Sequence, residues 1–249
     1  MSIHHLALHH RHHTRPPIVM QVRIEEFVKF TDALKAEYLR MYSHQVIPDK
    51  RTGQVYGAIA KISVGKSRYQ AVEASTKVPW FVIGIIHLLE CDSRFDCHLH
   101  NGDPLTARTV DVPRGRPKVG TPPFTWEASA VDALQYAELS TWKDWSIPGT
   151  LYKLEGYNGW GSRNHGIAPH YLWGGTKFYN RGNYISDGIW SPAAVSLQIG
   201  AAPILYTMDQ QKLIDFPTVE GLGNQDSMQG LNTGVAGSSL EPPTNSGVI

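Results

Sequence analysis

The stretch Val78-Pro-Trp-Phe-Val-Ile-Gly-Ile-Ile-His-Leu-Leu-Glu-Cys-Asp92 decides the fold of this chain of 249 residues. Pro79 suits the first turn of a helix, where its missing N–H is no loss. The residues that follow are apolar on every face of that helix except at His87, which is typical of a helix inside a globular core. They are too few to span a bilayer, which needs about 20 apolar residues. The sequence therefore predicts a central buried helix over residues 79–91.

Glu90 stands at the end of this predicted helix, before a loop rich in Asp, His and Asn. A carboxylate in this position is partly desolvated and faces the negative end of the helix dipole, and both effects raise a carboxyl pKa. A raised pKa is what a carboxyl group needs to act as a general acid near neutral pH. The alternative interpretation is a surface carboxylate that happens to end a helix.

Helical periodicity recurs on both sides of the buried helix. After that helix, Thr106-Ala-Arg-Thr-Val-Asp-Val112 alternates and is rich in β-branched residues, which favours a short strand. The sequence thus predicts a mainly α (α+β) domain with a small β element after the central buried helix. The other helices are expected over residues 24–45, 56–75, 125–139, 147–157 and 191–211.

The two ends of the chain differ in composition from the middle. Residues 1–20 hold six histidines by position 13, and we expect them to form a disordered leader. A metal-binding tail is the alternative, but adjacent histidines without a cysteine or carboxylate partner do not define a closed site. Residues 216–249 are rich in Gly, Ser, Asn and Pro and poor in large apolar residues, which is typical of disorder. The folded domain is therefore expected over residues 21–215.

Charge and cysteine content exclude several classes of protein. Lys plus Arg is 23 and Asp plus Glu is 22, so the chain has no global basic field of the kind that indicates nucleic-acid binding. Two cysteines, Cys91 and Cys97, are too few for a disulfide framework, and we expect free thiols rather than a bridge or a zinc site. No stretch resembles a signal peptide or a transmembrane segment. We therefore expect a monomer that is made in the cytoplasm and does not insert into a membrane.

A second motif, Glu155-Gly-Tyr-Asn-Gly-Trp160, follows late in the chain. Together with Glu90, Ser93 and Phe95 it resembles the signatures of the lysozyme-like superfamily, in particular of muramidases and lytic transglycosylases. In those transglycosylases the acidic Glu is closely followed by Ser and then an aromatic residue, and Ala-Tyr-Asn-Ala-Gly stands near a helix end. Here two extra residues precede the Ser, and the second motif departs from the family pattern at both alanines and at the final glycine, where Trp160 stands.

Two longer stretches, 98–110 and 122–127, resemble the lysozyme-like domains of phage endolysins and of bacterial proteins that carry peptidoglycan-binding modules. The resemblance covers about residues 24–212. It implies a lysozyme-like fold and a glycosidase that cleaves the bond between N-acetylmuramic acid and N-acetylglucosamine in peptidoglycan, without a cofactor or a metal. The resemblance alone favours peptidoglycan over chitin as the substrate.

The same resemblance implies roles for individual residues. Glu90 would be the general acid, since lysozyme uses such a Glu to protonate the leaving oxygen. Hydrolysis also needs a second carboxylate, for which Asp103 is the candidate; the alternative is a turn-forming Asp before Pro104. Glu127 is a weaker candidate. In lytic transglycosylation the sugar's own hydroxyl closes a 1,6-anhydro ring, and no second carboxylate is needed.

Candidate substrate-binding residues follow the acid along the chain. Tyr157 and Asn158 match the family motif and would contact the substrate or position the acid. His100, Asn101 and Trp160 are further candidates for lining the substrate groove. For His100 and Trp160 a purely structural role is the alternative.

Two other functions stay open at the level of sequence. A zinc-dependent peptidoglycan amidase or peptidase would use His98, His100 and Asp103 with His165 or His170 as ligands. The spacing of these residues matches no zinc motif such as His-Glu-x-x-His, and EDTA sensitivity would test it. A non-catalytic domain that binds cell-wall glycans would use the many aromatic residues, but it leaves the carboxylate at the end of an apolar helix unexplained.

Overall fold

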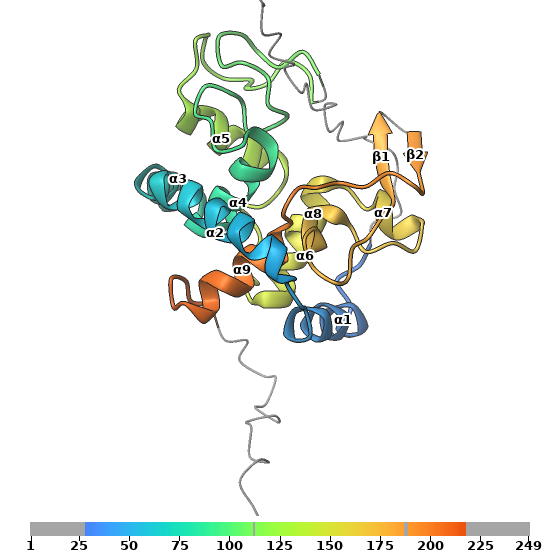
Figure 1. Ribbon diagram of the computed structural model, residues 1–249. Helices are drawn as coiled ribbons and strands as arrows, with labels where there is room; N and C mark the ends of the chain where they lie inside the picture. Colours follow the sequence, from blue (N-terminus) through green and yellow to red (C-terminus); the bar gives the residue numbers. More distant parts are fainter. Residues whose placement is uncertain (1–27, 112, 187–188, 218–249) are drawn as a thin grey trace, which may run out of the picture. The chain divides into compact units, whose positions relative to one another are not determined.

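The computed structural model describes residues 28–111, 113–186 and 189–217. Within these ranges the chain is mainly helical, as the sequence predicts, and its strands form a single two-stranded sheet (Figure 1). The expected leader and all but two residues of the expected tail lie outside the described residues. In chain order the elements are α1 (Asp32–Ser43), α2 (Asp49–Val64), α3 (Lys66–Thr76), α4 (Trp80–Cys91), α5 (Trp126–Tyr136), α6 (Ile147–Asn158), α7 (Gly161–Asn164), α8 (His170–Trp173), β1 (Asn183–Ser186), β2 (Ile189–Ser191) and α9 (Ala201–Gln210).

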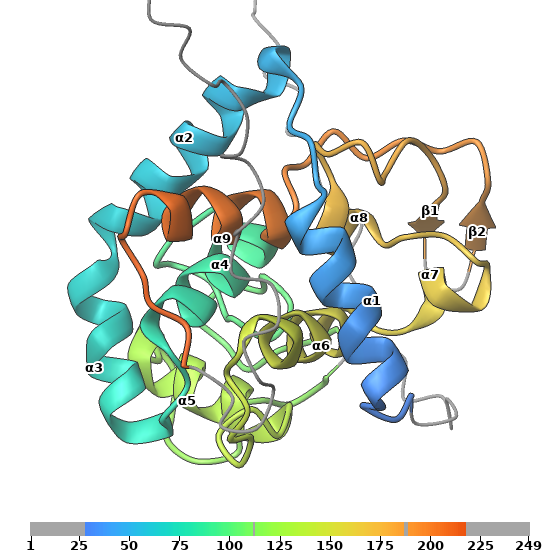
Figure 2. The ribbon, with the colours of Figure 1, turned by 90° about the horizontal axis from the view of Figure 1, so that it is seen from below.

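Helix α4 lies in the core, as predicted over residues 79–91. It contacts α2, α3 and α6, and every residue from Phe81 to Leu89 is buried (Figures 1 and 2). Gly84 lets the neighbouring helices approach closely, because a Cβ at this position would lie 2.7 Å from Ile62 Cγ2 and 3.0 Å from the ring of Tyr69. Burying one large apolar side chain stabilises a fold by about 1.5–3 kcal/mol. Helix α4 therefore supplies a large share of the hydrophobic stabilisation.

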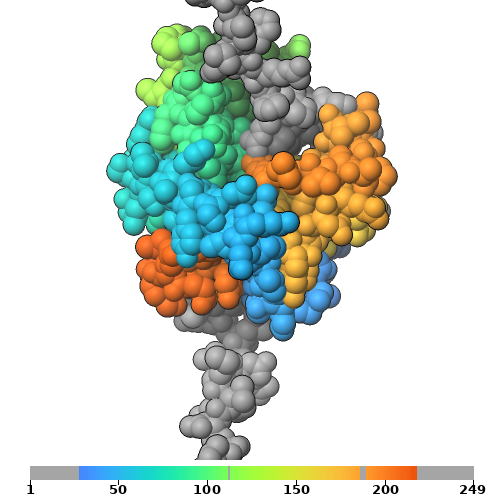
Figure 3. Space-filling view, in the orientation of Figure 1, coloured from blue at the N-terminus to red at the C-terminus, as the bar shows by residue number. Residues whose placement is uncertain are grey.

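The single helix predicted over residues 56–75 is in fact two helices, α2 and α3. They are separated at Gly65, which has φ −87° and ψ 0°. Glycine disfavours a continuous helix, and a Cβ here would lie 2.5 Å from the ring of Tyr69. The break lets α3 pack against α4 and α5 while α2 packs against α4 and α9. Figure 3 shows α2 and α3 as the lighter blue and cyan parts of the surface.

The strand predicted over residues 106–112 is wrong for its described part, residues 106–111. The backbone N–H groups of Val110 and Asp111 donate to the carboxylate of Asp103, at 2.8 and 3.2 Å, instead of to a neighbouring strand. The described residues between α4 and α5 hold one isolated bridge, between Cys97 and Pro104. Side-chain hydrogen bonds of this kind compete with sheet formation. A loop held by side chains therefore replaces the predicted β element.

The sheet lies much later in the chain, where the sequence predicted no strand. Strands β1 and β2 are antiparallel, with Asn183 opposite Ser191 and Tyr184 opposite Trp190. The ring of His165 stacks on Trp190 with centroids 4.1 Å apart and holds the hairpin against the end of α7. Because Ser191 belongs to β2, the helix predicted over residues 191–211 is too long at its start, and α9 begins only after Gly200.

The first helix and the end of the described chain also refine the expected boundaries. Helix α1 begins at Asp32, so residues 28–31 of the predicted helix are not helical, and its residues 24–27 lie outside the described residues. Thr31 Oγ1 accepts a hydrogen bond from Leu34 N at 3.3 Å and caps the helix. Phe216, the first residue of the expected tail, packs against Phe81 with ring centroids 5.6 Å apart.

All helices of the described chain are short. The longest, α2, has 16 residues, which corresponds to about 24 Å at about 1.5 Å per residue. Among the described residues no single helix is long and apolar enough to cross a membrane. Helices α3 and α4 reach that length only as a pair bent by 117°.

Candidate functional site

Glu90 stands where α4 leaves the core. Residues Phe81–Leu89 before it are buried, Glu90 itself is half-buried, and Asp92 in the following turn is exposed. Asp92 and Ser93 have left-handed backbones, with φ 53° and 60°, and Ser93 N donates to His87 O at 3.2 Å. This left-handed turn ends the helix. Glu90 therefore sits on a well-packed helix at the boundary between core and solvent.

The turn Asn101–Asp103 packs against the end of α4. Gly102 has φ +82°, which favours glycine, and a Cβ here would lie 3.5 Å from the backbone oxygen of Glu90. Asn101 Nδ2 donates to Asp103 Oδ2 at 2.9 Å, and Asp103 N donates to Asn101 Oδ1 at 3.0 Å. The structure thus brings three of the predicted site residues together, namely Glu90, Asn101 and Asp103.

Asp103 also organises the loop that follows. Its Oδ2 accepts the hydrogen bonds from Val110 N and Asp111 N in addition to the one from Asn101. Its backbone oxygen accepts a hydrogen bond from His98 N at 2.6 Å. These contacts show the turn-forming role that the sequence left as one alternative for Asp103. A catalytic role for its carboxylate stays a prediction.

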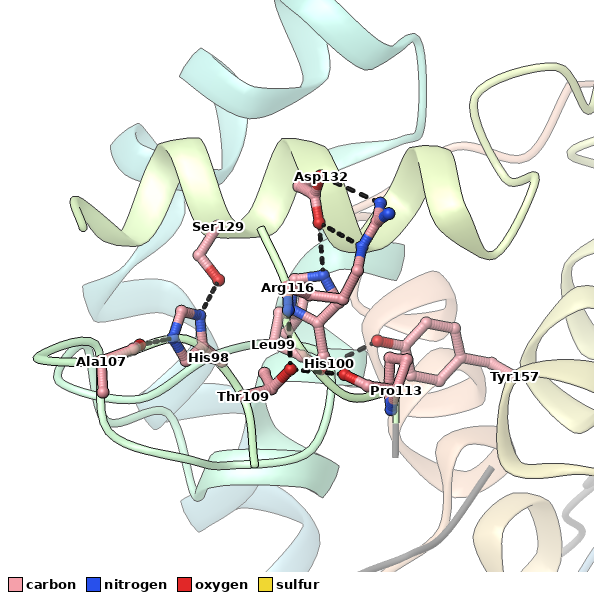
Figure 4. A network of polar contacts seen from close by, with 10 residues as sticks. All are labelled: His98, Leu99, His100, Ala107, Thr109, Pro113, Arg116, Ser129, Asp132 and Tyr157. Carbon is pink, nitrogen blue, oxygen red and sulfur yellow. Dashed lines mark hydrogen bonds and ion pairs between the residues drawn. The ribbon is translucent and has the colours of Figure 1, made fainter. Parts of the chain in front are cut away.

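His100 fastens the same loop to α5. Its Nε2 donates to Asp132 Oδ2 at 2.8 Å, and Arg116 binds the two oxygens of this carboxylate at 2.8 and 2.9 Å (Figure 4). Two parallel bonds between an arginine and a carboxylate are strong and directional. His100 is only 7% exposed, and its Nδ1 is buried without a hydrogen-bond partner among the described residues. The contacts of His100 are therefore structural.

His98 is buried, and both of its ring nitrogens are used. Nδ1 lies 2.7 Å from Ser129 Oγ and Nε2 lies 2.8 Å from Ala107 O (Figure 4). Because a carbonyl oxygen only accepts, Nε2 carries the proton and Nδ1 accepts from the serine hydroxyl. In the part of the chain that the structure describes, no three His, Cys, Asp or Glu side chains are grouped so that they could hold a metal ion. The zinc ligand set considered from the sequence is therefore not assembled there.

The buried His100 makes stability depend on pH. Burial lowers the pKa of His100 to about 4, although the hydrogen bond to Asp132 opposes this shift. Since the pKa in an unfolded chain is about 6.5, protonation between pH 6.5 and 4 favours the unfolded state. The stabilisation is complete above pH 6.5 and is lost as the pH falls toward 4. Replacing His100 by Gln should therefore reduce the acid-induced loss of unfolding free energy by about 2 kcal/mol.

Urea denaturation of both proteins at about pH 7, 5.5 and 4.5 measures this difference. Parallel profiles for wild type and His100→Gln would contradict the prediction.

Tyr157 anchors the loop from the opposite side, at the end of α6. Its hydroxyl donates to Leu99 O at 2.8 Å, and the side chain is buried (Figure 4). Burial raises the pKa of Tyr157, and the nearby charge of Glu90 raises it further. Tyr157 therefore lies beside the candidate acid and holds the residue before His100. This arrangement suits positioning of the acid, one of the two roles expected from the sequence.

Asn158 and Trp160 lie beside Tyr157 in the chain. Asn158 is the last residue of α6 and is half-buried. The half-buried ring of Trp160 packs on Tyr152, with centroids 5.1 Å apart. Gly156 makes room for it, because a Cβ there would lie 3.1 Å from the indole ring. Trp160 thus covers the end of α6, and contacts of Asn158 and Trp160 with a substrate stay predictions.

Replacing Tyr157 by Phe should destabilise the protein by about 1–3 kcal/mol, because the buried carbonyl of Leu99 loses a donor. It should also lower lytic activity, since the loop beside Glu90 is released. Tyr152→Phe is the matched control, because Tyr152 is on the same helix and donates to Val28 O at 2.7 Å, away from the loop. It should cost similar stability but little activity. Equal activity losses in the two variants would show that the loop anchor is not specific to the site.

Other carboxylates near the core are engaged by cations. Both oxygens of the buried Glu155 bind Arg163 at 2.8 Å, and the hydroxyl of Tyr38 donates to Oε2 at 2.6 Å. Glu127 is bound by Arg68 at 2.5 and 3.1 Å, and this pairing lowers the pKa of Glu127. Neither is therefore placed to give a proton to a substrate. Glu90 is the better candidate for the acid.

Asp132 and Arg116 are parts of the site that the sequence analysis missed. A signal for Asp132 is its spacing from the buried Ser129, three residues earlier, because positions i and i+3 lie on one face of a helix. Arg116 lies in a loop rich in Pro and Arg, where nothing in the sequence distinguishes it from its exposed neighbour Arg114.

Comparisons of the chain with models of protein families, with curated protein sequences and with solved structures found no match. The class of protein is therefore defined by the described residues alone: a mainly helical domain in which a buried helix ends in a half-buried glutamate. The loop that faces this glutamate is fastened to α5 and α6.

Proposed function

We propose that this protein cleaves the glycan strand of peptidoglycan between N-acetylmuramic acid and N-acetylglucosamine, with Glu90 as the general acid. The observation that carries the proposal is the half-buried residue Glu90 at the end of a helix whose residues Phe81–Leu89 are all buried. A general acid must be held in position and must also reach the substrate. The packing of α4 supports the first condition, and the partial exposure of Glu90 supports the second. A lysozyme-like fold is part of this proposal and is supported by the mainly helical domain.

In the proposed reaction Glu90 gives its proton to the glycosidic oxygen while positive charge develops on the sugar ring. Two outcomes are then possible. Water attacks with the help of a second carboxylate, for which Asp103 is the candidate, or the hydroxyl of the muramic acid itself closes a 1,6-anhydro ring. Tyr157 keeps the loop with Asn101 and Asp103 beside Glu90 in both cases. The protein would act at the cell wall, where peptidoglycan lies.

Mass spectrometry of the products from purified peptidoglycan tests this function. Reducing muramic acid ends indicate hydrolysis, and 1,6-anhydro ends indicate transglycosylation. Cut peptides without new sugar ends would instead support an amidase or peptidase. Binding to peptidoglycan without any product would support a glycan-binding domain, and either result would refute the proposal.

Asp103→Asn separates the two glycosidase mechanisms. The amide oxygen of Asn can still accept the bonds from Val110 N, Asp111 N and Asn101, so the loop should keep its shape. A large loss of activity with an unchanged melting temperature supports a second catalytic carboxylate. A small loss with 1,6-anhydro products supports transglycosylation.

A further inference from the structure

The two cysteines of the chain bracket the turn that ends α4, and the proposed reaction does not use them. Cys91 and Cys97 are both free and buried. Cys91 Sγ donates to His98 O at 3.3 Å, and Cys97 Sγ donates to Arg94 O at 3.2 Å. Each thiol therefore contacts the segment that carries the other, because His98 directly follows Cys97 and Arg94 N donates to Cys91 O at 3.1 Å.

The surroundings of the two thiols shift their pKa values in opposite directions. The hydrogen bond between them, together with burial and the charge of Glu90, raises the pKa of Cys91. The same hydrogen bond lowers the pKa of Cys97, and nearby Arg94 contributes to the lowering. The thiolate is the nucleophile in disulfide exchange. Cys97 is therefore the residue that attacks first. Cys97 is only 2% exposed, so the turn with the exposed residues Arg94 and Asp96 has to open locally before a small disulfide reaches the thiol.

We propose that Cys91 and Cys97 form a disulfide when the folded protein meets a disulfide oxidant. The thiolate of Cys97 attacks one sulfur of a small disulfide such as oxidised glutathione, and the first glutathione leaves as a thiolate that takes up a proton. Cys91 then loses its proton and attacks the sulfur of Cys97, which releases the second glutathione. Two thiols are thereby oxidised, and one glutathione disulfide is reduced to two glutathione molecules.

The bond would fasten the loop to the end of α4 beside Glu90. Cys97 pairs with Pro104 in the isolated bridge, and the next residue, His98, binds Asp103 O. The disulfide would therefore also restrict the motion of the turn Asn101–Asp103. The functional consequence rests on the proposed function, because peptidoglycan lies outside the cytoplasmic membrane, where thiols are readily oxidised. The protein would then carry free thiols where it is made and a covalent loop anchor where it acts.

Titration of the full chain in glutathione buffers of increasing oxidising strength tests the proposal. After quenching, alkylation under denaturing conditions and mass spectrometry show the thiol state. The folded protein should lose two hydrogens, with the peptides containing Cys91 and Cys97 linked to each other. The ratio of reduced to oxidised glutathione that breaks this bond should be at least ~10-fold higher for the folded protein than for the urea-unfolded chain. The reason is that the folded state holds the two thiols together. The oxidised protein should melt about 5 °C higher than the reduced one.

Cys91→Ser is the control, and it should stop at a glutathione adduct on Cys97. Three results would overturn the proposal. The folded protein could keep both thiols, it could form only glutathione adducts or disulfide-linked dimers, or its disulfide could be reduced as easily as that of the unfolded chain. None of these measurements involves glycan cleavage. An inactive protein with an intramolecular disulfide would therefore refute only the proposed function, and an active one without it would refute only this inference.

Discussion

Glu90→Gln should lower lytic activity on purified peptidoglycan by at least about 10²-fold and up to about 10⁴-fold, the range that general acid catalysis contributes. Glutamine keeps the shape and the hydrogen-bonding capacity of the side chain but has no carboxylic proton to give. The fold should survive, because the buried residues Phe81–Leu89 supply the packing of α4 and glutamine keeps the size of the side chain. Release of soluble muropeptides over time measures the effect, with a thermal melt to verify folding.

Asp92→Asn is the control for this experiment. It removes a carboxylate from the same turn, where Asp92 forms an exposed ion pair with Lys61 at 2.7 Å. Exposed pairs of this kind contribute about 0–1 kcal/mol, so stability and activity should stay close to those of the wild type. A folded Glu90→Gln protein that cuts glycan as fast as Asp92→Asn would show that the acid lies elsewhere.

Arg163→Met should destabilise the protein by about 3 kcal/mol, because it leaves the buried carboxylate of Glu155 without its cation. Arg163 binds both oxygens of Glu155 and also Glu37, at 2.9 Å, so this guanidinium joins α1, α6 and α7. The side chain of Glu155 is 1% exposed, which means that water cannot replace the lost partner. The free energy of unfolding from urea denaturation measures the loss.

Glu37→Gln provides the comparison, since it removes the other carboxylate partner of the same guanidinium. Glu37 is 37% exposed, so its replacement should cost less than about 1 kcal/mol. The double variant Glu155→Gln, Arg163→Met should recover part of the stability lost in Arg163→Met, because the unpaired charge is gone. Equal losses for Arg163→Met and Glu37→Gln would contradict a buried ion pair at this position.

The core helix was the most predictable part of the molecule. Its apolar residues are contiguous, so burial on all sides follows from the sequence without knowledge of its neighbours. The prediction of a strand over residues 106–112 failed for the opposite reason. Its β-branched pattern is a local signal, but the carboxylate of Asp103 takes up the backbone N–H groups of Val110 and Asp111. The hairpin β1–β2 was missed although Asp187-Gly188 stands between its strands, a pair typical of hairpin turns.

The candidate site was predictable only in part for a similar reason. Glu90, Asn101 and Asp103 lie close in sequence, and the chain has little room to separate them. In the sequence Asp132 lies 32 residues after His100 and 16 residues after Arg116. Contacts between residues so far apart in sequence depend on how the whole loop folds. Neither periodicity nor composition carries that information. The anchor from Tyr157 to Leu99, 58 residues apart, is hidden in the same way.

The different attachments of α4 and of its facing loop should give them different dynamics. Amide hydrogens in the middle of α4 are covered by α2, α3 and α6, so they should exchange with solvent only when the domain unfolds. The loop has no helix or strand among its described residues, and it is fastened by the bonds to Asp132 and from Tyr157 and by the buried Leu99 and Leu105. Such regions open locally more readily than a core helix. A long, stiff polymer could then be admitted by a swing of the loop alone. Glu90, the proposed proton donor, would keep its position during this motion, because it belongs to α4, the helix whose amide hydrogens should exchange only on unfolding.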